Sequence, residues 1–143
     1  MTLIELIQLV LEDALWSALA AMGFAILFNV PRRSLLYCML IAAVGHASRA
    51  VMIETFDLSI VASTFVGATV IGFLAKMAAR QLQMPSMIFA ISAAIPMVPG
   101  VFAFQTMLGI LRIIELPSDE IVPVLGDIAS NGITTGLILA ALA

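Results

Sequence analysis

Long apolar stretches, separated by short polar breaks, make up most of this 143-residue chain. A helix that crosses the hydrocarbon core of a bilayer needs about 20 mainly apolar residues. Stretches of about that length or longer occupy residues 4–28, 35–53, 59–77, 85–114 and 122–143. The pattern predicts an all-α integral membrane protein, a bundle of about five transmembrane helices that forms a single domain over residues 1–143.

The composition agrees with a membrane location. Hydrophobic residues make up 63% and charged residues 10% of the chain, whereas an average soluble domain is about 45–50% apolar and about 25% charged. The net charge of −3 and the lack of a basic run argue against nucleic-acid binding. The single cysteine, Cys38, has no partner for a disulfide or a metal pair, and we interpret it as a small buried hydrophobe.

The loop charges predict an orientation. Basic residues lie in the first and third breaks, at Arg32, Arg33, Lys76 and Arg80, and acidic residues lie in the other two, at Glu54, Asp57, Glu115, Asp119 and Glu120. Because basic loops stay in the cytoplasm, the N-terminus is predicted outside and the C-terminus inside. The first stretch lacks a basic leader and a cleavage site, so we expect it to remain as a span. Arg112 lies near a helix end and can snorkel to the interface, whereas Arg49 is deeper.

The fourth stretch carries Pro96, Pro99 and Gly100 near its middle. The prolines lack backbone donors and free the carbonyls of Ser92 and Ile95, and the glycine adds conformational freedom. We therefore expect this helix to be broken at Pro96–Gly100. Many secondary transporters build substrate sites from such discontinuous helices. The alternative is a proline kink that only shapes the bundle.

Ionisable residues inside a membrane are functional candidates, because burying them in lipid is expensive. His46 and Arg49 share a helix face and lie roughly 16 and 21 Å from the start of the second stretch. Asp13 and Asp127 lie roughly 14 and 8 Å below the outer surface, so either acid could neutralise Arg49. One interpretation is a structural ion pair between helices. In the other, Arg49 holds a substrate carboxylate and His46 carries a coupling proton, since imidazole titrates near physiological pH.

Three further polar or small-residue patterns have a structural as well as a functional interpretation. Glu5, Gln8 and Glu12 share one face and suggest an interfacial amphipathic segment, from which Asp13 is expected to point away. In the third stretch, small residues recur at four-residue spacing and are expected to let helices pack closely. They form two sets: Ser59, Ser63 and Gly67, and Ala68 and Gly72. In the fifth stretch, Asp127, Asn131 and Thr134 or Thr135 form a polar stripe. This stripe either lines a water-filled path or joins helices by hydrogen bonds.

The chain contains no nucleophile–base pair, metal cluster, nucleotide loop or haem motif. We therefore expect a protein that is not an enzyme and that has neither a metal nor a cofactor.

Three segments carry a family resemblance: residues 23–31 (GFAILFNVP), 45–49 (GHASR) and 94–100 (AIPMVPG). In order and spacing they resemble the threonine/serine exporter (ThrE) family, and in particular the small membrane subunit of its split, YjjB-type form. The resemblance covers nearly the whole chain. Asp13 is similar to an acidic position of the family's first helix, whereas Asp127 fits the family pattern less well.

The resemblance implies a function. Family members export small metabolites, threonine and serine or, for the split type, dicarboxylates such as succinate, across the bacterial cytoplasmic (inner) membrane. Export is thought to be driven by the proton motive force. The split form pairs the small subunit with a larger membrane subunit, so this chain is expected to need that partner or self-association.

These observations leave three hypotheses. The first is a subunit of a proton-coupled exporter of small carboxylate-bearing metabolites. Its expected substrate-binding residues are Arg49, His46, Pro96, Pro99, Gly100 and Asn131, and its expected proton-coupling residues are His46 and Asp13. The second is a non-transporting structural membrane subunit, and the third is a small channel. The residues do not distinguish hydroxy amino acids from dicarboxylates as substrates.

Overall fold

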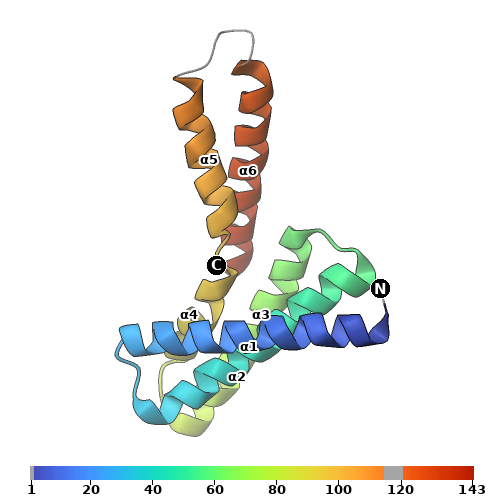
Figure 1. The fold of residues 1–143 in the computed structure, drawn as a ribbon. Coiled ribbons are helices and arrows are strands. Elements are labelled where there is room, and N and C mark those ends of the chain that lie inside the picture. The colour runs from blue at the N-terminus through green and yellow to red at the C-terminus, as the bar shows by residue number, and fades with distance from the viewer. Residues whose placement is uncertain (1, 115–120) are drawn as a thin grey trace. The chain divides into compact units, whose positions relative to one another are not determined.

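The computed structural model describes residues 2–114 and 121–143, and every regular element within these ranges is a helix (Figure 1). The chain divides into two compact units, one up to Met97 that also includes Leu142, and one that contains Val98–Ala141. Each unit is described by itself below. The acidic loop residues Glu115, Asp119 and Glu120, used above to predict the orientation, lie outside the described residues.

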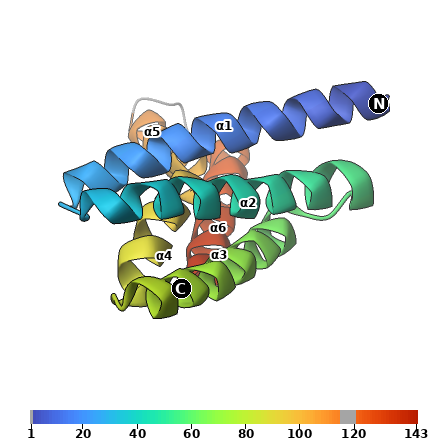
Figure 2. The ribbon, with the colours of Figure 1, turned by 90° about the horizontal axis from the view of Figure 1, so that it is seen from below.

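The first unit consists of three long helices and one short one. These are α1 (Leu3–Leu27), α2 (Arg32–Phe56), α3 (Ile60–Leu82) and α4 (Ser86–Ala94), followed by a 3₁₀ turn, η1 (Ile95–Met97). Helix α2 packs against both α1 and α3, and α4 packs against α3 and α2 (Figure 2). Short connections make successive helices antiparallel neighbours, as predicted.

Local signals define the helix ends. Thr2 and Glu5 form a capping box at the start of α1, in which the Glu5 amide donates to Thr2 Oγ1 at 3.3 Å and the Thr2 amide donates to Glu5 Oε2 at 2.8 Å. Asn29, Asp57 and Gln83 adopt positive φ angles of 59°, 50° and 53° just after α1, α2 and α3. A left-handed residue at this position ends a helix by turning the chain away from its axis.

The core of the first unit is built from small side chains. Ala21, Ala42 and Ala75 are fully buried, and Phe89 supplies one of the few large side chains among them. Large apolar residues instead lie on the outside, for example Phe73, which is 66% exposed. Small residues let helix backbones approach closely, and lipid is the natural solvent for the apolar exterior.

Helices α2 and α3 approach most closely at Gly45 and Gly67. A Cβ on Gly67 would lie 3.0 Å from the Gly45 carbonyl oxygen and 3.3 Å from Arg49 Cβ, and a Cβ on Gly45 would collide with Ile71. The predicted packing role is therefore confirmed for Gly67. Gly72, in the second predicted set of small residues, has nothing within 4 Å of its Cβ position and makes no close helix contact.

The predicted break in the fourth stretch is confirmed. Helix α4 ends at Ala94, the 3₁₀ turn η1 contains Pro96, and α5 begins at Gly100. Pro99 occupies the position before the first residue of α5. Residues 86–97 span about 18 Å, too short to cross a hydrocarbon core of about 30 Å.

The second unit is a helical hairpin of α5 (Gly100–Ile113) and α6 (Ile121–Leu142). The helices meet where a Cβ on Gly109 would lie within 3.1 Å of Ile128 Cδ1 and where Gly132 faces Thr106. Within the described ranges, four helices are long and apolar enough to span a membrane, and the broken α4–α5 pair gives a fifth candidate. The prediction of a helical membrane protein with about five spans is confirmed.

Candidate functional site

A cleft of 380 Å³ lies between α1 and α2 in the first unit. It is lined by Leu9, Glu12, Asp13 and Trp16 of α1 and by Arg49, Ala50, Ile53 and Glu54 of α2. Because the two helices are antiparallel, the early turns of α1 face the late turns of α2. The cleft thus runs from the last turn of α2, which carries Glu54, inward to Arg49.

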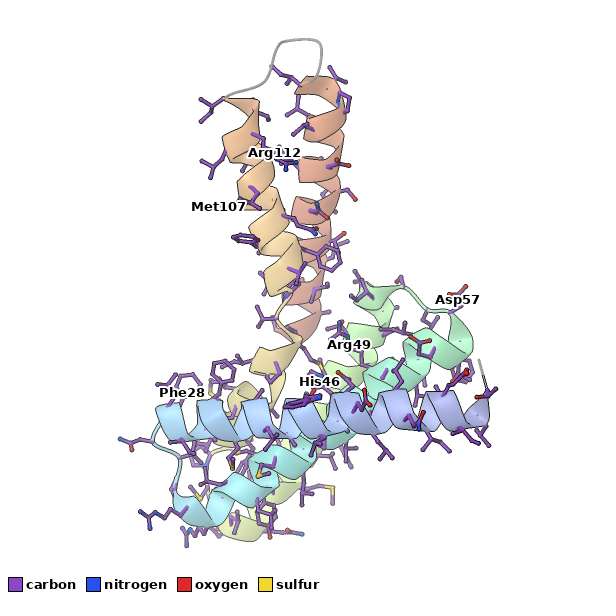
Figure 3. All side chains as sticks on the ribbon, in the orientation of Figure 1. Phe28, His46, Arg49, Asp57, Met107 and Arg112 are labelled. Carbon is purple, nitrogen blue, oxygen red and sulfur yellow. The ribbon has the colours of Figure 1, made fainter. Side chains whose placement is uncertain are left out.

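Arg49 is the only cation that lines this cleft. Its side chain is half-buried, and Nε is fully buried without a hydrogen-bond partner among residues 2–114 and 121–143. Arg49 lies three residues, about one helical turn, after His46 on α2, and Figure 3 labels both side chains. A buried N–H without a partner costs free energy, so this atom calls for a ligand or water that the cleft can admit.

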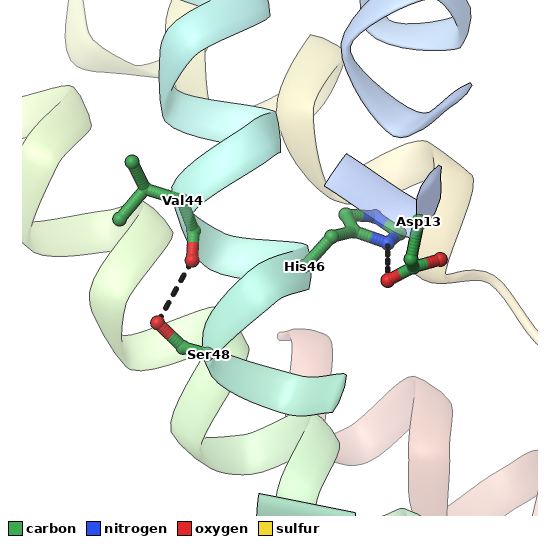
Figure 4. A network of polar contacts seen from close by, with 4 residues as sticks. All are labelled: Asp13, Val44, His46 and Ser48. Carbon is green, nitrogen blue, oxygen red and sulfur yellow. Dashed lines mark hydrogen bonds and ion pairs between the residues drawn. The ribbon is translucent and has the colours of Figure 1, made fainter. Parts of the chain in front are cut away.

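His46 lies beside Arg49 but faces α1. Its Nδ1 atom lies 3.7 Å from Oδ2 of Asp13, and a dashed line marks this pair in Figure 4. The His46 side chain is only 4% exposed, whereas that of Asp13 is 44% exposed. His46 Nε2 is buried and has no hydrogen-bond partner in the part of the chain that the structure describes. The pair therefore joins an accessible carboxylate in the cleft to an imidazole in the protein interior.

Several other polar side chains of this unit form hydrogen bonds within their own helices, and the buried Ser34 hydroxyl donates to Met84 Sδ at 3.2 Å. The Thr64 hydroxyl donates to the Ile60 carbonyl at 2.6 Å, and the partly buried Ser48 hydroxyl donates to the Val44 carbonyl at 2.8 Å (Figure 4). Hydroxyl groups in membrane helices commonly form such bonds. Among the described residues, His46 and Arg49 alone carry a buried side-chain nitrogen or oxygen without a partner, which distinguishes them from the structural polar groups.

The break after α4 is connected to Arg49 by packing. A Cβ placed on Gly67 would lie 2.9 Å from Met97 Cε on one side and 3.3 Å from Arg49 Cβ on the other. Met97, the last residue of η1, is 1% exposed. A change of backbone conformation at the break would therefore move a side chain that packs close to Arg49. Pro96 itself does not line the cleft.

The other predicted site residues lie in the second unit. Pro99 and Gly100 form the start of α5. Asn131 lines a separate cleft of 410 Å³ between α5 and α6. Asp127 lines this same cleft together with Arg112. In the first unit, Asp13 is the predicted acid that lines the cleft with Arg49.

Two cleft residues were missed from the sequence. Glu54 was assigned to a loop but lies in the last turn of α2, and Glu12 was assigned to an interfacial face. The expectation that Asp13 points away from Glu12 was wrong, because both line the cleft. Successive helical positions differ by about 100°, and a cleft between two helices is wide enough to include both. The sequence did offer a signal for Glu12, because its carboxylate directly precedes Asp13 in the chain.

The spanning helices and the partly buried guanidinium and imidazole define a multi-pass membrane protein with an internal polar site. Sequence comparison specifies the class further: the profile described as "Threonine/Serine exporter, ThrE" matches residues 13–143. The chain belongs to the threonine/serine exporter family, a family of transporters.

One relative is an uncharacterized protein of Haemophilus influenzae, to which the chain is 37% identical over 133 residues. The match covers 92% of this chain but 43% of the relative, so the chain spans less than half of that protein's length. No solved structure matches the chain.

Proposed function

We propose that this chain is a membrane subunit of a proton-coupled exporter of small carboxylate-bearing metabolites, and that Arg49 binds the substrate carboxylate. The observation that carries the proposal is the buried, unpartnered Nε of Arg49 at the wall of a 380 Å³ cleft. The planar guanidinium fork matches a carboxylate in geometry and charge. Family membership supports the exporter class.

The charges of the cleft favour an amino acid over a dicarboxylate. Glu12, Asp13 and Glu54 share the cleft with Arg49, so carboxylates outnumber cations three to one. A zwitterionic amino acid of the threonine or serine type presents an ammonium to these acids and a carboxylate to Arg49. Succinate, the alternative, would bring a second negative charge against them, and like charges at short range repel.

Asp13 and His46 supply a route for proton coupling. Asp13 is accessible in the cleft and lies 3.7 Å from the buried His46. When Asp13 is ionised it can hold the substrate ammonium, and a proton that binds Asp13 removes this charge. The proton and the amino acid then compete for the Asp13 carboxylate. Such competition couples the inward movement of protons to the outward movement of substrate. His46 accepts the proton from Asp13 on the interior side.

The broken segment provides the moving part. Pro96 and Pro99 keep η1 and the start of α5 from forming a continuous helix. Transporters of several folds alternate access by moving such discontinuous segments around a central site. Motion here is relayed through Met97 and Gly67 to the backbone that carries Arg49.

A larger membrane subunit is the proposed partner. More than half of the Haemophilus relative lies outside the matched region, and we infer that a second chain of the same family supplies the corresponding part. The complex would reside in the bacterial inner membrane with the N-terminus of this chain outside. In this orientation the cleft opens at Glu54 toward the side from which driving protons enter.

Counterflow in proteoliposomes tests the proposal. Vesicles that contain this chain, with and without the larger subunit, are assayed for uptake of labelled threonine and labelled succinate in exchange for unlabelled substrate, with and without a pH gradient. We expect threonine exchange that requires both chains and responds to the gradient. Preferred succinate exchange would contradict the charge argument. A stable complex without flux of either label would favour the non-transporting structural subunit.

A further inference from the structure

The α5–α6 hairpin exposes a polar face that lipid cannot cover. Gln105, Arg112, Asp127 and Ser130 are exposed, and α5 has no buried residue. Both helices belong to candidate membrane spans. Arg112 lies in the last turn of α5 and can snorkel to the interface, but amide and carboxylate side chains that face hydrocarbon cost several kcal/mol, so Gln105 and Asp127 favour a polar partner surface.

The hydrogen bonds of the hairpin leave the same groups available. The hydroxyls of Thr106 and Thr135 donate to carbonyls of their own helices, at 2.8 Å each. In residues 98–114 and 121–143, the side chains of Gln105 and Asn131 form no hydrogen bond, and Arg112 and Asp127 form no ion pair within 4.0 Å. Within these described ranges, the groups without partners are the amides and the two charges that line the 410 Å³ cleft.

The size of this face favours a protein over a small molecule. Asp127, Asn131 and Thr134 recur along α6 over about 10 Å. Ser130 extends the polar surface beyond the cleft lining. Gly126, one turn before Ser130, has nothing within 4 Å of its Cβ position, which leaves room for the close approach of another helix.

The charges on this face would complement those on a second copy of the same face. It carries one arginine, one aspartate and two carboxamides, and carboxamides both donate and accept hydrogen bonds. Arg112 and Asp127 line one cleft, so they lie at similar depth. A two-fold axis along the membrane normal preserves depth and brings unlike charges together, as an interface between identical surfaces requires.

We propose that the α5–α6 hairpin is a self-association surface, on which a second copy of this chain packs with Arg112 of one copy facing Asp127 of the other. The proposal is independent of the Arg49 cleft.

Disulfide cross-linking in membranes tests this pairing. Cys38 is the only cysteine, so a Cys38→Ser background accepts a single new thiol. Ser130→Cys on the polar face should form an oxidised species of twice the chain mass, and chains of two tag lengths should give a hybrid. Ala129→Cys is the matched control, because Ala129 is also exposed and at the same depth but points about 100° away. Equal cross-linking at both positions, or none at Ser130→Cys, would overturn the proposal.

A charge reversal tests the partner's identity. Arg112→Asp and Asp127→Arg, each expressed alone with Ser130→Cys, place like charges together and should lower cross-linking by at least about tenfold. Co-expression of the two variants should restore it, since in the mixed dimer every contact again joins opposite charges. Failure of the mixed pair to cross-link, with both variants inserted, would contradict pairing of two copies. Cross-linking of Ser130→Cys to the larger subunit in place of a second copy would also contradict it.

Discussion

At the scale of single residues, the decisive feature is which polar groups remain without partners. The hydroxyls of Ser48 and Thr64 in the first unit donate to carbonyls of their own helices, so their polarity serves the structure. Arg49 and His46 instead retain buried nitrogens without partners. A charged fork and a titratable ring that stay unsatisfied next to a cleft are suited to bind a ligand that arrives and leaves.

Replacing Arg49 tests the carboxylate site. Arg49→Lys keeps a positive charge but loses the two-pronged geometry, and Arg49→Ala loses both. We expect at least about tenfold weaker threonine binding for the lysine variant, equal to about 1.4 kcal/mol, and no measurable exchange for the alanine variant. Half-saturation in counterflow gives the affinity. Wild-type exchange by a well-inserted Arg49→Ala protein would exclude this role.

Replacing Asp13 tests proton coupling. Asp13→Asn keeps the size of the side chain but cannot ionise. We expect its exchange of labelled for unlabelled threonine to respond no longer to a pH gradient, because proton and substrate no longer compete at this position. Glu5→Gln is the matched control, since Glu5 belongs to the capping box of α1 and does not line the cleft. The assignment fails if both variants retain the same gradient response as the parent protein.

At the scale of elements, the contact between α2 and α3 holds the site in place. The Gly45 carbonyl, Arg49 Cβ and Met97 Cε all approach Gly67. The three groups can come this close because Gly67 has no side chain. The contact joins the helix that carries His46 and Arg49 to the turn that precedes the break. Small residues at this crossing therefore serve packing and, through Met97, the proposed relay of motion.

Gly67→Ala tests this contact. The added methyl would lie 3.0 Å from a backbone oxygen, which can move only with its helix, and we expect about 1–3 kcal/mol of destabilisation. Gly72→Ala on the same helix has open space at its Cβ and should be neutral or stabilising by about 0.5–1 kcal/mol. Thermal unfolding of both variants in one detergent provides the comparison. Equal losses in the two variants would show that the crossing tolerates a methyl group.

At the scale of the whole molecule, the apolar exterior indicates that lipid surrounds the helices, and the charges of the loops predict the orientation in the membrane. Large apolar side chains are exposed on all long helices, which lipid can cover. The basic loops at Arg32–Arg33 and Lys76–Arg80 predict the cytoplasmic side. The proposed entry of protons through the cleft near Glu54 depends on this predicted orientation.

Thiol labelling of intact cells tests the orientation. Asp57→Cys and Gln83→Cys form a matched pair in the Cys38→Ser background, because both residues are exposed, lie just outside opposite ends of α3 and have φ angles of 50° and 53°. A membrane-impermeant maleimide should label Asp57→Cys and leave Gln83→Cys unlabelled until the cells are opened. The reverse pattern would invert the proposed direction of proton entry.

The sequence by itself determined the elements of this protein. Apolar stretches of span length predicted the long helices, because the hydrophobic requirement of a bilayer acts on each segment separately. The break at Pro96–Gly100 was equally predictable, since a proline lacks its amide donor in any context. Helix α2 nevertheless extends past the predicted 35–53 to Arg32–Phe56, because hydropathy marks the hydrocarbon portion and a helix continues into the interface.

The tertiary structure alone decided which polar groups meet. Spacing along a helix determines the depth of a residue but not the neighbour it faces, so Asp13 and Asp127 were equivalent candidates for Arg49. Packing of α1 on α2 places Asp13 with Arg49 and adds Glu12 and Glu54, while α5 and α6 bring Asp127 to the cleft of Arg112. The physical reason is that helix rotation and pairing depend on contacts between segments far apart in the chain, here on glycines whose missing side chains allow α2 and α3 to touch.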